Sequence, residues 1–271
     1  MTTTVAEVDR SPRPEVLPEP ARLLEELGEP LCLDDYDWSR ARAQPLTDEE
    51  IFQLTYAAEV EWGTEGTFAS LDISNDPVVK RFLRIWLDQE VVHAQLLARF
   101  LGAVGVTAEP RHRTPRQRRA ATRGKWINRA ARRVVGDDFF GVHMTWGAVG
   151  ELTTLRFYGL IRGNTRNELL RVLLRDLMVQ EAKHYTFYRT AAIRRLVDKR
   201  RGQRIVRWAM EHLWSPVGVG LRSRSDADRL LLGLFDDRPD QVAQMDAQLN
   251  RIPGLAGLDL MQGTLVAARS A

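Results

Sequence analysis

The pattern Glu181-Ala182-Lys183-His184 occurs a second time as Glu90-Val91-Val92-His93. On an α-helix the three-residue spacing places the glutamate and the histidine on one face. A further glutamate precedes each copy: Glu151 lies 30 residues before Glu181, and Glu61 lies 29 residues before Glu90. The chain therefore carries one unit twice. The repeat predicts four helices that each direct acidic or imidazole side chains toward a common interior.

Both copies interrupt helical stripes that are otherwise apolar, so the sequence predicts that these charged side chains are buried. Burying several carboxylates without a compensating charge is costly, and two metal ions would supply that charge. Carboxylate oxygen and imidazole nitrogen are ligands that iron and manganese accept. In the predicted arrangement two glutamates bridge the ions, two are terminal and each histidine binds one ion. The predicted ligands are Glu61, Glu90, His93, Glu151, Glu181 and His184.

Two alternatives to this ligand set remain, and one further match to the pattern is set aside. Glu65 shares the stripe of Glu61 one turn further along and is the other candidate on the first helix, whereas Glu59 should face away. A buried polar network without metal would also satisfy the pattern. A third Glu-x-x-His, from Glu109 to His112, contains Pro110 and is therefore not expected to be helical.

The hydrophobic periodicity predicts an all-α protein whose long helices span 47–73, 77–101, 137–162 and 166–199. Shorter helices are expected at 21–27, 126–135, 204–213, 226–234 and 238–251. Thr47 and Glu50 form a capping-box pattern at the start of the first long helix. We expect residues 1–46 to be an N-terminal tail with a short helix and 47–271 to be one helical domain, with core helices over 47–199 and accessory helices over 200–271.

Composition is ordinary for a globular protein, with 271 residues of which 44% are hydrophobic and 28% charged. No uninterrupted apolar run approaches the roughly 18 residues of a membrane span. The N-terminus lacks the features of a signal peptide, and a single cysteine, Cys32, fits a reducing compartment, so a cytoplasmic location is expected.

Positive charge gathers in two runs. Residues 111–133 hold ten Arg or Lys and no acidic residue, and residues 189–207 hold eight against Asp198 alone. Such runs are either solvated surface or docking sites for an acidic partner. No nucleic-acid recognition motif accompanies them, and no nucleic-acid partner is expected.

The segments Gly150-Glu151-Leu152-Thr153-Thr154 and Gln180-Glu181-Ala182-Lys183-His184 resemble the second half of the ferritin-like di-iron proteins. The soluble acyl-acyl-carrier-protein desaturases and related small bacterial di-iron oxygenases are the most similar members, and the likeness spans about 47–192. The resemblance implies a ferritin-like four-helix bundle with additional peripheral helices and two Fe ions, with Mn as the alternative metal. It also places Thr154 beside the oxygen-binding position, as a candidate catalytic residue; the alternative is that Thr154 only fills the helix seam.

The resemblance implies an oxidoreductase that activates O2 to desaturate or hydroxylate an acyl chain or a small molecule. It further implies an acyl carrier protein that docks on residues 111–133, a ferredoxin-type electron donor and a possible homodimer. The alternatives are N-oxygenation in small-molecule biosynthesis, iron or peroxide handling of the ferritin or rubrerythrin kind, and an interaction protein without catalysis. We expect His143, two turns before Glu151, to be a core or supporting residue rather than a ligand, with Tyr185 and Tyr188 packing in the core.

Overall fold

The structure is a computed structural model that describes residues 17–68, 76–109, 133, 135–136 and 138–271, with the backbone alone for 65–68. These residues form α-helices and two short 3-10 helices, η1 (Leu33–Asp35) and η2 (Trp38–Arg42), and no strand longer than an isolated bridge. The prediction of an all-α protein is confirmed. The helices are α1 (Pro20–Glu26), α2 (Asp48–Phe68), α3 (Pro77–Ala103), α5 (Asp138–Asn164), α6 (Glu168–Leu196), α7 (Arg200–His212), α8 (Arg224–Phe235), α9 (Pro239–Leu249) and α10 (Leu260–Arg269).

The starts of α2, α3 and α6 follow from local capping chemistry. At α2 the Thr47 backbone N–H donates to the Glu50 carboxylate at 2.7 Å, and the Glu50 N–H donates to the Thr47 hydroxyl at 3.2 Å, which confirms the capping box. Asp76 accepts from the first turn of α3, where Pro77 supplies a helical φ without needing a donor. Asn167 caps α6 in the same way.

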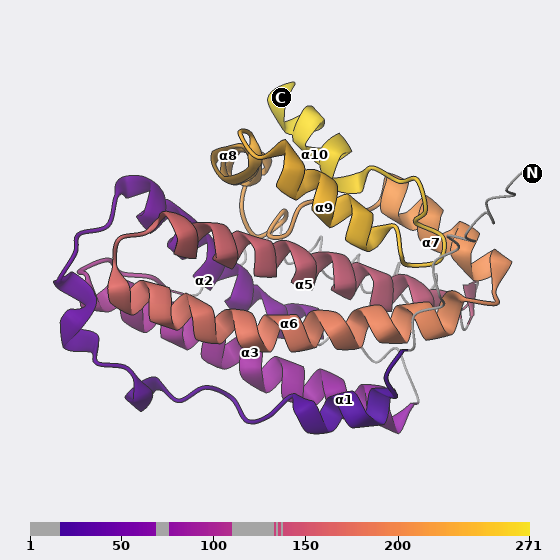
Figure 1. Cartoon of the computed structure of the whole chain (residues 1–271), viewed down its shortest axis with the longest axis horizontal. Helices are drawn as coiled ribbons and strands as arrows, with labels where there is room; N and C mark the ends of the chain where they lie inside the picture. Colours follow the sequence, from indigo (N-terminus) through magenta and orange to yellow (C-terminus); the bar gives the residue numbers. More distant parts are fainter. Residues whose placement is uncertain (1–16, 69–75, 110–132, 134, 137) are drawn as a thin grey trace, which may run out of the picture.

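Four long helices lie side by side, in two closely packed pairs, α2 with α3 and α5 with α6 (Figure 1). Helix α3 also contacts α6, which joins the pairs. The predicted stripes are buried at this interface, as Phe82, Leu97, Leu173 and Leu177 show with no exposed surface. Because the charged repeats sit on the same stripes, the packing brings them into the middle of the molecule.

The segment before α2 covers one side of the long helices. Helix α1 lies against α6 and α3, and Leu23, Leu24 and Leu27 are buried beneath it (Figure 1). Asn167 at the start of α6 donates to the carbonyls of Ala41 and Gln44 at 2.7 and 2.8 Å, and these hydrogen bonds hold the end of the segment against α6. Buried leucines and these hydrogen bonds therefore hold both ends of the segment against the long helices.

Helices α7, α8 and α9 contact α5, and α10 packs on α8 and α9 (Figure 1). Three of them match the predicted short helices, but α10 was not predicted. Its first turn is capped from another helix, because the Asp246 carboxylate of α9 accepts from Met261 and Gln262 N–H at 2.8 and 3.0 Å. A long-range cap of this kind leaves no local sequence signal. The helix expected at 126–135 falls almost wholly outside the described residues.

No helix in the described ranges is long and apolar enough to cross a membrane.

Candidate metal centre

The six predicted ligands come from four helices and lie together in the core. Glu61 is on α2, Glu90 and His93 are on α3, Glu151 is on α5, and Glu181 and His184 are on α6. Every one is buried, and the most accessible, Glu151, is only 7% exposed. The helical pairing of the two repeats therefore concentrates four carboxylates and two imidazoles in a solvent-poor volume.

The donor atoms form two overlapping groups of four. Glu61, Glu90, His93 and Glu181 make one group, and Glu90, Glu151, Glu181 and His184 make the other, with the donor atoms of each group within 4.8 Å of one another. Glu90 and Glu181 belong to both. The arrangement therefore fits two adjacent metal ions that share two carboxylates.

The histidines direct Nδ1 toward the shared carboxylates. His93 Nδ1 lies 3.0 Å from Glu181 Oε1, and His184 Nδ1 lies 3.1 Å from Glu90 Oε1. The contacts run across the two repeats as well as within them. Each imidazole is thus placed beside a carboxylate from the opposite half of the chain.

Several of these buried atoms have no hydrogen-bond partner among the described residues: Glu90 Oε1, both oxygens of Glu181, and Nδ1 of His93 and His184. Buried polar atoms are normally paired, and an unpaired buried carboxylate is especially costly. All five atoms are potential metal donors that converge on one volume. Buried Glu and His groups able to hold metal ions are what the structure establishes here.

Burial and mutual repulsion oppose ionisation of the carboxylates in the cluster. Burial, together with the charge of Glu181, raises the pKa of Glu90 to about 7 and that of Glu151 to about 8. Burial also raises the pKa of Glu61 well above its usual value. Burial acts in the same direction on Glu181, but its contacts with His184 and His93 outweigh it and hold the pKa low. The carboxylates cannot all ionise without added positive charge, which a metal would provide.

A second layer of side chains fixes the candidate ligands. Trp86 Nε1 donates to Glu151 at 2.9 Å, and the Tyr158 hydroxyl donates to Glu61 at 2.5 Å. Neither residue was singled out from the sequence, because both occupy stripe positions that a core aromatic would also fill.

Two glutamines hold the outer nitrogens of the histidines. His93 Nε2 lies 2.8 Å from Gln180 Oε1, and His184 Nε2 lies 2.6 Å from Gln89 Oε1. Sequence reasoning missed these glutamines as well, although a signal exists. A glutamine precedes the glutamate in both repeats, so the duplicated pattern is Gln-Glu-x-x-His.

Of the other residues considered in the sequence, Glu59 and His143 belong to neither donor group. Glu59 faces away, as expected, and pairs with Arg222 at 2.8 Å. The side chain of Glu65 lies outside the described residues, as does His112. His143 belongs to neither donor group; burial lowers its pKa to about 4, and its ring lies 6.1 Å from that of Tyr188.

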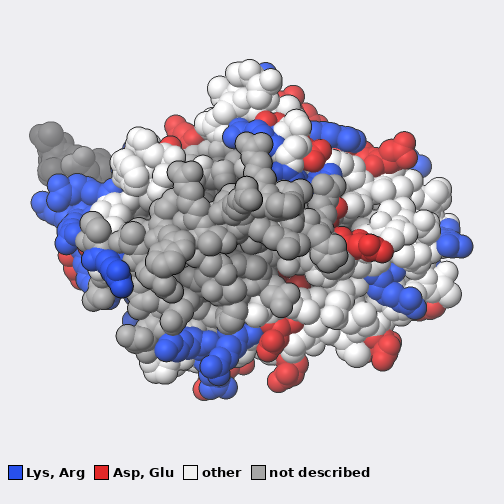
Figure 2. Space-filling model, turned by 180° about the vertical axis from the view of Figure 1, so that it is seen from behind, with Lys and Arg blue, Asp and Glu red and all other residues white. Residues whose placement is uncertain are grey.

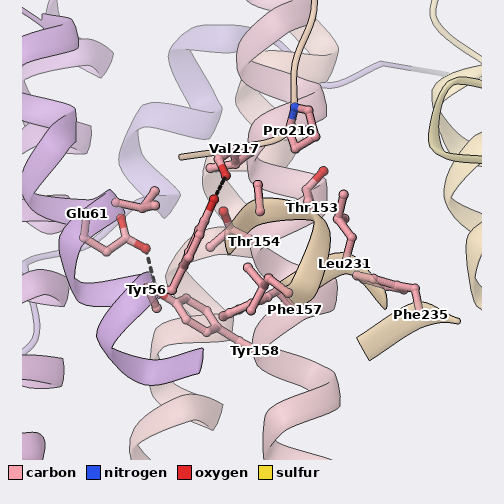
Figure 3. Close-up of a pocket in the computed structure, with 14 residues that line it drawn as sticks. Tyr56, Glu61, Thr153, Thr154, Phe157, Tyr158, Pro216, Val217, Leu231 and Phe235 are labelled. Carbon is pink, nitrogen blue, oxygen red and sulfur yellow. Dashed lines mark hydrogen bonds between the residues drawn. The ribbon is translucent and has the colours of Figure 1, made fainter. Parts of the chain in front are cut away.

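An apolar pocket reaches the cluster from the side of α8 (Figure 3). It has a volume of about 40 Å³ and is lined by residues of α2, α5, the 216–217 connector and α8. Glu61 lies at one side and is the only lining residue with an ionisable carboxylate. The Tyr56 hydroxyl, also in the wall, is engaged by donating to the Val217 carbonyl at 2.7 Å.

Thr154 lines this pocket together with Glu61. Its neighbour Thr153 donates its hydroxyl to the Val149 carbonyl at 2.7 Å, whereas the Thr154 hydroxyl makes no hydrogen bond to any described residue. Thr154 therefore offers the one uncommitted hydroxyl among the described side chains of this wall.

No protein-family model matches the chain, and no curated protein or solved structure is significantly similar to it.

Proposed function

We propose that the cluster binds two iron ions and that the protein is an O2-dependent oxidoreductase of the ferritin-like kind. The observation that carries the proposal is the two groups of buried donor atoms, which share Glu90 and Glu181 and include atoms without a hydrogen-bond partner among the described residues. Manganese accepts the same donors and is the alternative metal. When bound, a pair of redox-active ions of this type supplies the electrons and the binding position for dioxygen.

The chain's own residues would perform three tasks. Glu61, Glu90, Glu151, Glu181, His93 and His184 hold the ions. Trp86 and Tyr158 orient two terminal carboxylates through hydrogen bonds. Thr154 presents its hydroxyl to the pocket that Glu61 also lines, where it can donate or accept a proton during the oxidation.

The pocket supports an apolar substrate group. No Lys, Arg or Asp lines it, so a charged group would be buried there without a partner. A volume of about 40 Å³ accommodates roughly three water-sized groups, which suits a slender hydrocarbon segment. We therefore favour an acyl chain that is desaturated or hydroxylated, carried by an acyl carrier protein, with electrons from a ferredoxin-type donor.

The test begins with metal content after anaerobic reconstitution with iron, followed by absorbance of the reduced protein mixed with oxygen. Two irons per chain and an oxygen-dependent spectral change that speeds up with acyl substrate support the proposal. Uptake of many irons per chain in a large assembly would instead indicate iron storage, and stable folding without any metal uptake would indicate an interaction protein.

Replacing Thr154 with valine should leave two irons bound but slow substrate oxidation by about 10-fold to 100-fold, because the free hydroxyl is lost while the shape of the pocket is kept. Thr153→Val is the matched control, since that hydroxyl is already committed to Val149. Turnover and oxygen consumption are measured for both variants. Equal turnover in Thr154→Val and wild type would leave Thr154 a packing residue.

Reversing the charge of the arginines in 111–133 should weaken carrier-protein binding without changing metal content, because an acidic carrier would dock through them. This run lies outside the described residues, apart from Arg133. Arg200 and Arg204 of the second basic run are exposed on α7, and reversing their charge is the comparison. Figure 2 shows that basic side chains gather at one edge of the molecule. Unchanged affinity after reversal of 111–133 would mean that this run is solvated surface.

A further inference from the structure

A short stretch of backbone, Leu27 to Glu29, lies over the outer ends of both glutamines. Gln180 Nε2 donates to the Glu29 carbonyl at 2.8 Å. Gln89 Nε2 donates to the Gly28 carbonyl at 3.1 Å and to the Leu27 carbonyl at 3.3 Å. One segment, which follows α1 directly, therefore contacts the supporting residue of each histidine.

These contacts fix which way each amide points. A backbone carbonyl only accepts hydrogen bonds, so the amide end that faces it must be the NH2 group. The oxygen of each glutamine is then directed at the histidine, at 2.8 Å for His93 and 2.6 Å for His184. Because that oxygen also only accepts, each histidine must carry its proton on Nε2 toward the glutamine.

A neutral histidine protonated on Nε2 presents an unprotonated Nδ1. In both histidines Nδ1 faces the shared carboxylates, where a metal ligand is needed. The hydrogen bond made by the second ring nitrogen is known to set tautomer and orientation in metal-binding histidines. Here the glutamines are nearly inaccessible, with Gln89 0% and Gln180 4% exposed, so water does not compete for these bonds.

We infer that the Leu27–Glu29 backbone is a positioning element that sets the tautomer of both candidate metal-binding histidines, acting crosswise through Gln180 on His93 and through Gln89 on His184. The inference rests on the proposed metal site. If the inference holds, the metal affinity of the site depends on the packing of α1 and Leu27–Glu29 against α3 and α6.

The segment has its own structural requirements. Leu23, Leu24 and Leu27 are buried and anchor it on the long helices. Gly28 has a φ of +76°, in the left-handed region that a side chain disfavours, and Lys183 Nζ donates to the Leu27 carbonyl at 3.2 Å. A Cβ at Gly28 would meet only Lys183 Nζ, at 3.8 Å, so substitution there acts through the backbone and not through a clash.

The first test uses zinc, which is diamagnetic, and the full-length protein. In the zinc-loaded wild type, NMR should show slowly exchanging Nε2–H protons on His93 and His184. Gln180→Leu should abolish the protection of the His93 proton alone, and Gln89→Leu that of His184 alone. Zinc affinity should fall about 10-fold to 100-fold in each variant, the usual range for loss of such a supporting bond.

The second test perturbs the segment and leaves both glutamines in place. Gly28→Val should lower zinc affinity about 10-fold and reduce protection of both ring protons together. Gly257→Val is the matched control, because Gly257 has a φ of +70° and nothing within 4 Å of an added Cβ, in a loop between α9 and α10. It carries a similar backbone cost but should leave zinc affinity unchanged.

The outcomes distinguish the two proposals. If the wild type takes up zinc but each glutamine variant alters the histidine of its own helix, or neither, the crosswise inference is wrong while the metal site stands. If Gly28→Val and Gly257→Val behave alike, the segment has no positioning role. If the wild type takes up no zinc, the proposed metal site fails and this inference fails with it.

Discussion

Replacing Glu181 with alanine should remove both metal ions from the protein. Glu181 is fully buried, it belongs to both donor groups, and its two oxygens lie near Nδ1 of His93 and of His184 at 3.0 and 3.5 Å. Its loss takes a ligand from each ion at once. We expect metal content to fall from two ions per chain to none after reconstitution, as measured by elemental analysis, with helical content retained by circular dichroism.

Carboxylates that belong to one donor group only should have a smaller effect on metal content than Glu181. Glu61 and Glu151 each belong to one donor group only, so Glu61→Ala and Glu151→Ala should each retain one ion. Glu109→Ala is the control for loss of a carboxylate outside the cluster, since Glu109 is exposed. Full metal loading of Glu181→Ala, or equal loss in Glu109→Ala, would contradict the placement of the site.

Without metal, the protein should become less stable as the pH rises from 4.5 to about 8. The usual glutamate pKa is 4.5, and the folded protein raises it to about 7 in Glu90 and about 8 in Glu151. The folded state therefore binds more protons than the unfolded state in this window, and its advantage is lost as these groups ionise. His184, whose pKa its contacts with Glu151, Glu181 and Glu90 raise against burial, acts in the same direction.

Glu181 does not oppose this trend, because its lowered pKa affects stability only below the usual glutamate value. At about 1.4 kcal/mol per unit of pKa, the loss should be on the order of a few kcal/mol. Denaturant unfolding in chelator at several pH values measures it. Metal ions should abolish the loss, because they bind the ionised ligands and release the protons.

Glu151→Gln is the informative variant for this experiment. It keeps the shape of the side chain and removes one ionising group. The metal-free variant should match the wild type near pH 5 and exceed it in stability near pH 8. A wild-type stability in chelator that stays flat or rises between pH 4.5 and 8 would contradict the raised pKa values of Glu90 and Glu151.

Much of the fold was predictable because its signals are local. The capping box at Thr47 and the proline after Asp76 mark the starts of α2 and α3 within a few residues of sequence. The convergence of Glu90 and Glu181 was also predictable, because a charge on an apolar stripe must be compensated in the core. The metal-binding role of these residues, and the enzymatic activity, stay proposals.

What could not be predicted depends on distant parts of the chain. Helix α10 owes its cap to Asp246 on another helix, and the amides of Gln89 and Gln180 are oriented by backbone carbonyls near Gly28. Carbonyl groups are present at every residue, so no sequence pattern marks the ones that matter. The pocket beside Thr154 likewise requires α8 and the 216–217 connector, which approach α5 only in the folded chain.

The sharing of Glu90 and Glu181 between the two donor groups also has a consequence for folding kinetics. Helices α2 and α3 supply only three members of the first group, and α5 and α6 only three members of the second. Neither helical hairpin can complete a site until it docks against the other. Under the proposed function, metal would complete its ligand set only after docking, so it would slow unfolding more than it would speed folding.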